Sequence, residues 1–161
     1  MPPRSPSQRP IQTDDPVAIR LAAVALLARR DFSAEELRRK LLDRGFAEGA
    51  VRAVLGELSG AGLLDEARYV ESYVRAHVGR GHGPARIRAD LRRNGVPDTL
   101  IEAALDPVDW LELARKVRRA KFGARSPQDW TEKARQARFL QYRGFSADHI
   151  RSATGADPDL D

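Results

Sequence analysis

The glycine-rich stretch 79–83 (GRGHG) has the composition of a phosphate-binding loop. Such a loop normally follows a β-strand and has either dinucleotide-binding spacing or a lysine followed by serine or threonine at its end. Here a helical pattern precedes the glycines, and Pro84 follows them. The pattern therefore favours a flexible connector between helices, where glycine lets two helices hinge or approach a partner closely, with Arg80 and Arg86 beside the opening.

The histidines, His77, His82 and His149, do not form a metal-binding pattern. His77 and His82 are five residues apart, whereas ligands on one helical face are three or four apart. No cysteine is present to complete a site. The serines lie mainly at expected helix starts, where capping explains them, and the carboxylates mostly neighbour arginines. We therefore expect no metal, no cofactor and no enzymatic activity.

The basic side chains are the remaining candidates, because they could bind nucleic-acid phosphates or an acidic protein surface. In the stretch 107–122, Trp110, Leu113, Ala114 and Val117 form an expected core stripe that leaves the basic residues to one side. A solvated charged face is the plainer interpretation of any single arginine. The candidate partner-binding residues are Arg75, Arg80, Arg86, Arg92, Arg93, Arg115, Lys116, Arg118, Arg119, Arg135, Arg138 and Arg143. The aromatic residues Trp130 and Tyr142 could stack on a base, but we expect them to pack in the core.

Length and charge set broad limits on the class of protein. The 161 residues suffice for one domain or a few small modules, and 28 basic against 23 acidic residues give a net charge of +5. This excess permits an anionic partner without requiring one. No apolar run is long enough to span a membrane, and the first residues lack the apolar core of a secretory signal. We expect a cytoplasmic protein.

The spacing of apolar residues is helical throughout, as in the series Leu21, Val24, Ala25 and Ala28, and no segment alternates with period two. An all-α fold is therefore predicted.

Local signals predict where several helices begin. Ser33 and Glu36 form a capping-box pair, and Asp65 precedes an acidic first turn. Pro84 and Pro127 are each expected at the first position of a helix, where the missing N–H is not needed.

A repeat of about 50 residues organises these helices. Gly45, Gly95 and Gly144 are 50 and 49 residues apart, and each should adopt a left-handed conformation between two helices. Each glycine follows a leucine by four residues and precedes a β-branched residue by six; the leucines are Leu41, Leu91 and Leu140. Adding the helix before each pair gives three tandem three-helix repeats, which should stack into an elongated, curved helical rod.

The expected organisation is a disordered, proline-rich leader, three repeats and a frayed acidic tail. The corresponding ranges are 1–16, 17–62, 63–106, 107–155 and 156–161.

Several segments within the repeats resemble the RecX family of recombination regulators. The first is LLARRDFS at 26–33; the central signatures are LLDEARYV at 63–70 and GRGHGPARI at 79–87; a weaker ending is RFLQYRGF at 138–145. The resemblance covers about residues 17–154 and excludes the leader.

This resemblance implies a non-enzymatic negative regulator of RecA, acting in DNA repair, DNA recombination and the SOS response. Members bind the groove of the RecA–DNA filament and inhibit its ATPase, strand-exchange and co-protease activities. The implied partners are the RecA filament and, through backbone contacts, single- or double-stranded DNA. The alternative is a stand-alone DNA-binding protein, because short helices joined by a glycine turn also describe helix-turn-helix units.

Overall fold

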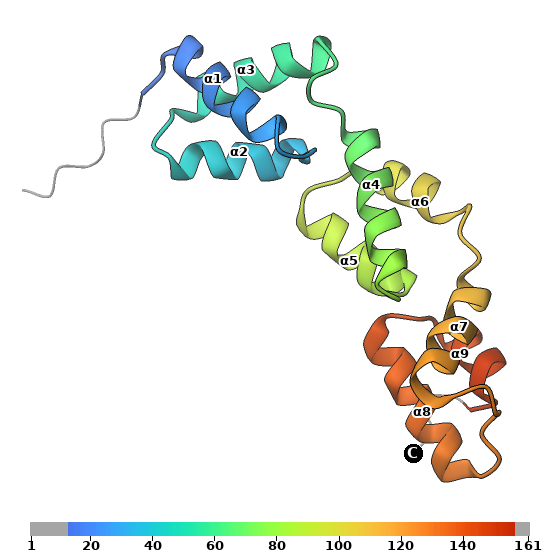
Figure 1. The fold of residues 1–161 in the computed structure, drawn as a ribbon. Helices are drawn as coiled ribbons and strands as arrows, with labels where there is room; N and C mark the ends of the chain where they lie inside the picture. The colour runs from blue at the N-terminus through green and yellow to red at the C-terminus, as the bar shows by residue number, and fades with distance from the viewer. Residues whose placement is uncertain (1–12, 157–161) are drawn as a thin grey trace, which may run out of the picture. The chain divides into compact units, whose positions relative to one another are not determined.

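The computed structural model describes residues 13–156, in which every regular element is a helix (Figure 1). The helices are α1 (Pro16–Leu27), α2 (Ala34–Asp43), α3 (Glu48–Gly60), α4 (Glu66–Gly79), α5 (Pro84–Arg93), α6 (Asp98–Leu105), α7 (Trp110–Phe122), α8 (Trp130–Arg143) and α9 (Ala147–Thr154). The only extended pairing in this range is an isolated bridge between Thr13 and Phe46. The predicted all-α fold of three three-helix repeats is confirmed, and the curved rod stays a prediction.

Most of the predicted helix starts are confirmed. The Ser33 hydroxyl accepts a hydrogen bond from the Glu36 amide at 3.0 Å, and the Asp65 carboxylate accepts one from the Arg68 amide at 3.0 Å. Pro84 is the first residue of α5. These contacts satisfy amides that have no partner within their own helix.

The predicted helix start at Pro127 is wrong. Pro127 is buried in the loop after α7, and α8 begins three residues later, at Trp130. Asp129 caps α8 by accepting a hydrogen bond from the Glu132 amide at 2.8 Å. A carboxylate at this position also interacts favourably with the helix dipole, which explains why the helix begins after Asp129.

The three repeat glycines have the predicted left-handed backbone. Their φ angles are 92° at Gly45, 73° at Gly95 and 95° at Gly144. Each turn connects two short helices of one repeat, namely α2 to α3, α5 to α6 and α8 to α9. Because residues other than glycine rarely adopt this backbone conformation, the glycine spacing determines where the helix pairs lie along the chain.

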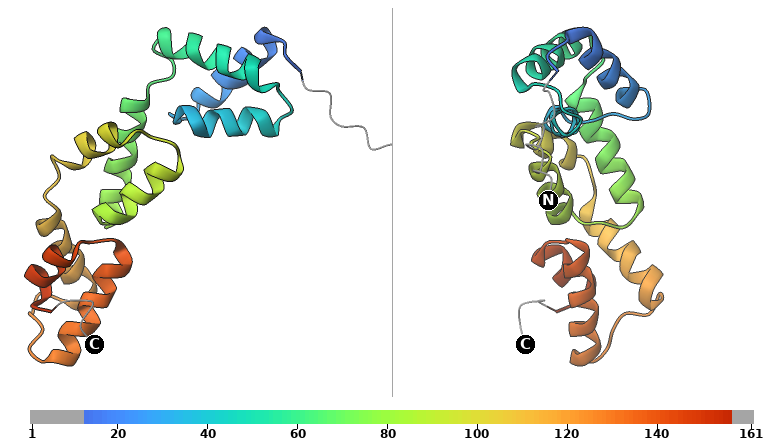
Figure 2. Two further views of the ribbon diagram at one scale, coloured as in Figure 1. Left: turned by 180° about the vertical axis from the view of Figure 1, so that it is seen from behind. Right: turned by 90° about the vertical axis from the view of Figure 1, so that its left-hand side faces the viewer.

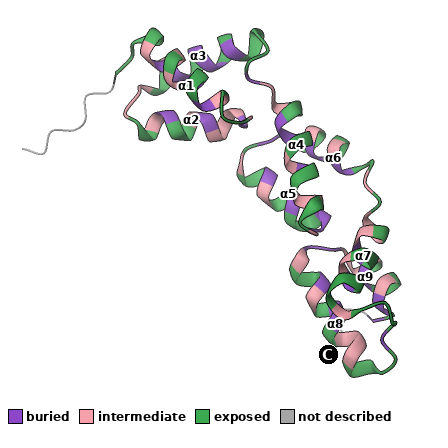
Figure 3. Ribbon diagram, viewed as in Figure 1, coloured by how far each residue is buried: buried purple, intermediate pink, exposed green. Residues whose placement is uncertain are grey.

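The described chain divides into two compact units between Tyr69 and Val70, inside α4. In the first unit, α3 packs against both α1 and α2. Figure 3 shows the buried residues along the facing sides of these helices. The core includes Ile19, Leu37 and Leu41, all fully buried. In the second unit, α9 packs against α7 and α8, and α5 contacts α6 (Figure 2).

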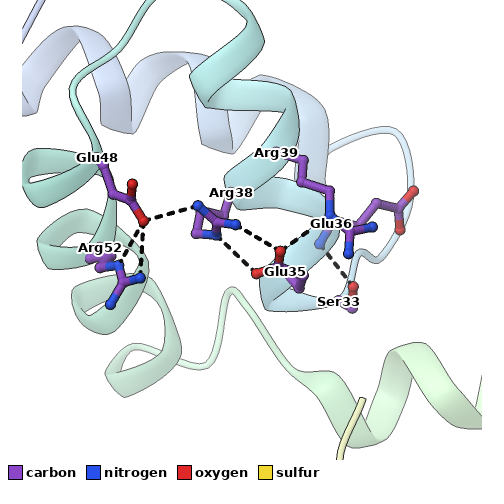
Figure 4. A network of polar contacts seen from close by, with 7 residues as sticks. All are labelled: Ser33, Glu35, Glu36, Arg38, Arg39, Glu48 and Arg52. Carbon is purple, nitrogen blue, oxygen red and sulfur yellow. Dashed lines mark hydrogen bonds and ion pairs between the residues drawn. The ribbon is translucent and has the colours of Figure 1, made fainter. Parts of the chain in front are cut away.

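A network of ion pairs covers one side of α2 and α3 (Figure 4). Arg38 donates to Glu35 at 2.8 Å and to Glu48 at 3.0 Å, and Arg52 donates to Glu48 at 2.9 Å. The hydrogen bonds from Arg38, together with the positive charges of Arg38 and Arg39, lower the pKa of Glu35 to about 2. The basic residues of this network are therefore occupied by carboxylates of their own repeat.

The expected leader and tail lie mostly outside the described residues. Within the described part of the leader, Thr13 donates to the Gly45 carbonyl at 3.1 Å and accepts from the Ala47 amide at 2.9 Å, and α1 begins at Pro16. Ala156, at the start of the expected tail, is buried against the core of the third repeat. No helix within residues 13–156 is long and apolar enough to cross a membrane.

We predict that Leu41→Ala and Leu91→Ala each reduce the free energy of unfolding by about 2–5 kcal/mol, because both side chains are fully buried. Denaturant titration followed by circular dichroism measures this loss. A loss well below about 1 kcal/mol would contradict the assigned inward faces of α2 and α5.

Candidate partner-binding surface

The glycine-rich stretch 79–83 forms a packed joint between the second and third repeats. The Gly83 amide donates to the Arg143 carbonyl at 2.7 Å, and the Ala85 amide donates to the Gly144 carbonyl at 2.9 Å. A Cβ on Gly83 would lie only 2.3 Å from the Gly144 carbonyl carbon. The expected connector between two helices is present, but Gly83 in it is buried. The close approach that Gly83 permits is to the backbone of Gly144 in the same chain.

A cavity of about 410 Å³ lies beside this joint, between α4, α7 and α8. We call it the joint cavity. Its lining combines apolar and cationic side chains and contains no carboxylate. The lining residues are Val78, Gly79, Arg80, Gly81, Leu113, Lys116, Val117, Ala120, Lys121, Phe139 and Arg143.

Ion pairing divides the candidate basic residues into two groups. Four of them contact a carboxylate of their own repeat: Arg92 with Asp98, Arg93 with Asp90, Arg119 with Glu112 and Arg135 with Glu132. Their charge is largely compensated within the chain. The second group has no carboxylate partner among the described residues; all its members are exposed except Arg143, which is partly buried. This group consists of Arg75, Arg80, Arg86, Arg115, Lys116, Arg138 and Arg143.

Arg118 does not face solvent, so its expected position off the core stripe is wrong. Only 5% of Arg118 is exposed. Its guanidinium donates to the Arg125 carbonyl at 3.2 Å and to the Gln136 side-chain oxygen at 3.3 Å. The loop before α8 thus covers Arg118, and helical spacing alone gives no signal of a loop folding over it.

Lys121 is a cationic residue of the cavity that the sequence reasoning missed. It lies four residues after Val117, which also lines the cavity, so the two share one face of α7. That spacing was an available signal. Arg80, Lys116 and Arg143 of the candidate set line the same cavity, whereas the other unpaired candidates lie outside it.

His77 and His82 contact each other, although their sequence spacing did not suggest it. Their Nδ1 atoms are 2.8 Å apart, and His82 is buried. Burial, together with the charges of nearby arginines, lowers the pKa of both side chains from 6.5. The turn at Gly81, with φ of 76°, brings them together. No three potential metal-ligating side chains gather anywhere in residues 13–156.

The expected core packing of two aromatic residues on α8 is wrong. Tyr142 is 87% exposed and Trp130 is 51% exposed. Tyr142 lies on the side of α8 away from the buried residues Gln136, Ala137 and Leu140, and Trp130 is the first residue of the helix.

Comparison with known protein families gives three adjacent matches along the chain. Residues 20–58 match the model described as RecX, first three-helix domain, and residues 65–105 match the second three-helix domain. Residues 108–154 match the third three-helix domain. The matches leave only short segments between them, so they account for nearly all the described chain.

Curated relatives and a solved structure agree with this result. A "Regulatory protein RecX" from Halorhodospira halophila is 49% identical over 141 residues, covering 86% of this chain and 88% of the relative. One from Pseudomonas putida is 46% identical over 149 residues, covering 91% and 96%. The crystal structure of RecX from Lactobacillus salivarius superposes with a TM-score of 0.76 at 23% identity, covering 87% of this chain and 94% of that one. This structural likeness supports the fold.

We predict that Gly144→Ala is markedly more destabilising than Gly45→Ala. Both glycines have φ near 90°, so alanine at either costs about 1–2 kcal/mol of backbone strain. A Cβ on Gly144 would additionally lie 2.7 Å from the Arg86 amide nitrogen, whereas a Cβ on Gly45 meets nothing within 4 Å. Unfolding titrations of the two variants measure the difference, and equal losses would show that the joint tolerates a side chain.

We also predict that the melting temperature falls as pH is lowered from 7.5 to 5. Because the folded pKa of His77 and His82 is below 6.5, the unfolded chain binds more protons just below that pH. The stability of the neutral pair is therefore complete above pH 6.5 and decreases as the pH falls towards the lowered folded pKa values. His82→Gln should show a smaller decrease. Thermal denaturation at several pH values measures this, and a flat wild-type profile would contradict it.

Proposed function

The chain belongs to the RecX family, and on that premise we propose that it is a negative regulator of the RecA recombinase. In this proposal it binds the groove of the RecA–DNA filament and inhibits ATP hydrolysis, strand exchange and co-protease activity. The observation that carries the proposal is the succession of three family-specific domains, with relatives named regulatory proteins. The protein then acts by binding, without enzymatic chemistry of its own.

The unpaired cations support a surface that contacts an anionic partner. Arg80, Arg86 and Lys116 are exposed and have no carboxylate partner among residues 13–156, so binding does not first require breaking an internal ion pair. Either an acidic surface of RecA or the phosphates of the DNA it coats fits this chemistry.

The alternative, a stand-alone helix-turn-helix protein, is less well supported by the helices that follow the glycine turns. A recognition helix presents basic or polar side chains to base edges. In α6 there is no basic residue, and in α3 and α9 the arginines, Arg52 and Arg151, contact Glu48 and Asp148. These helices instead bury Val51, Ile101 and Ile150 in their repeats.

The test is RecA-catalysed ATP hydrolysis on single-stranded DNA, with this protein titrated in and filament lengths imaged in parallel. We expect inhibition at less than one molecule per RecA protomer, together with shorter filaments. Unchanged hydrolysis and filament length would show that the proposed function is wrong. A mobility shift with duplex DNA in the absence of RecA tests the alternative, which requires binding to a defined sequence.

The double variant Arg86→Glu/Arg138→Glu should raise the concentration needed for half-inhibition by about tenfold or more, because two unpaired cations become repulsive. The melting temperature should change little, since both side chains are exposed. The control Arg125→Glu/Lys133→Glu makes the same change of charge outside the candidate set. Equal effects of both double variants would indicate a response to net charge alone.

A further inference from the structure

We propose that the joint cavity receives a large apolar side chain carried by an acidic segment of the partner protein. The inference rests on the proposed function, because it names the chemistry by which the regulated protein would be held. It concerns the second unit alone, within which the cavity lies entirely.

The floor of the joint cavity is apolar and comes from two repeats. The floor is formed by the partly buried Val78 of α4, Leu113 and Val117 of α7, and Phe139 of α8. Ala120 of α7 also lines the cavity, at an exposed position. A cavity of about 410 Å³ is within the range of sites that hold small ligands, ~300–1,000 Å³. Burying an apolar side chain there would remove the apolar surface of that side chain and the apolar surface of the cavity from water.

The rim of the joint cavity is cationic and uncompensated. Arg80, Lys116, Lys121 and Arg143 contribute four positive charges, and none of them pairs with a carboxylate in the described part of the chain. The lining residues include no acidic side chain. A matching ligand therefore carries negative charge around an apolar centre, which is the pattern of an acidic peptide segment.

The contacts of Phe139 favour a peptide over a nucleotide. Single-stranded nucleic acid is usually held by bases stacked on open aromatic rings. Phe139 is the aromatic residue in the lining, and it already has neighbours: the Arg143 guanidinium at 5.2 Å, Lys121 Nζ at 5.8 Å and the edge-packed ring of Phe122 at 5.2 Å. The remaining floor is aliphatic, which suits an apolar side chain better than a base.

The packed joint forms the joint cavity before any ligand binds. Gly81 approaches α7 so closely that a Cβ would lie 2.9 Å from a Val117 methyl carbon. The Arg143 side chain donates to the Arg80 carbonyl at 3.1 Å, which links two rim residues from different repeats. A preformed site loses less conformational entropy on binding than one that must be assembled.

The experiment uses the full-length protein with methyl-labelled valine and leucine and the peptide acetyl-Asp-Asp-Phe-Asp-Asp-amide as probe. We expect saturable shifts of the Val78, Leu113 and Val117 methyl signals. Replacing phenylalanine by alanine in the probe should weaken binding by about fivefold or more, because the apolar anchor is lost. Lys116→Glu in the protein should weaken binding by a similar factor, about fivefold, because a rim cation becomes an anion.

Two further variants separate the joint cavity from general charge. Ala120→Phe fills the cavity and should abolish the shifts, and Lys116→Glu, at an exposed position, keeps the test decisive if Ala120→Phe fails to fold. Lys133→Glu is the matched control in the same repeat, outside the cavity, and should change the dissociation constant by less than about twofold. Equal weakening by Lys133→Glu would overturn the proposal.

The outcomes distinguish the joint cavity from the function. If the protein inhibits RecA but the peptide shifts no cavity methyl, the cavity proposal is overturned and the function stands. If the peptide binds as expected but RecA hydrolysis is unaffected, the proposed function fails. If oligothymidylate shifts these methyl signals and the peptide does not, the joint cavity is a nucleic-acid site and the peptide proposal is overturned.

Discussion

The contact between the backbones at Gly83 and Gly144 is the constraint on which the second unit depends. Two hydrogen bonds, from the Gly83 amide at 2.7 Å and the Ala85 amide at 2.9 Å, connect the start of α5 to the end of α8, and neither Gly83 nor Gly144 has room for a side chain. Because this contact places the C-terminal end of α4 beside α7 and α8, Arg80 of the second repeat lines the same cavity as Lys116 and Arg143 of the third. A backbone contact of this kind therefore determines which cations share one cavity.

Ion pairing then determines which of those cations are available to a partner. In the first unit, Arg38 and Arg52 bind carboxylates of their own repeat, as do Arg92 and Arg119 in the second. The modest net charge of +5 thus conceals an uneven distribution, in which the uncompensated positive charge around the joint cavity matters more than the sum. Local neutralisation elsewhere confines the attraction for an acidic partner to part of the surface.

Features encoded within a few residues could be predicted from the sequence, and features that depend on contacts between repeats could not. The turn at Gly45 and the cap at Ser33 follow from local backbone geometry and hydrogen bonding, and the family resemblance followed from such short segments. The burial of Arg118 depends on the loop before α8, and the contact of His77 with His82 depends on the turn at Gly81. Because helical spacing describes one helix at a time, it predicts neither the burial of Arg118 nor the contact between His77 and His82.

The central claim is that the cations around the joint cavity contact the regulated protein. Hydrogen–deuterium exchange of the full-length protein, with and without RecA filaments on single-stranded DNA, tests it most directly. We expect slower exchange on binding in residues 78–84 and 113–121, with smaller changes in α2, whose arginines Arg38 and Arg39 pair with Glu35. Protection confined to other segments, with these two stretches unchanged, would contradict the claim.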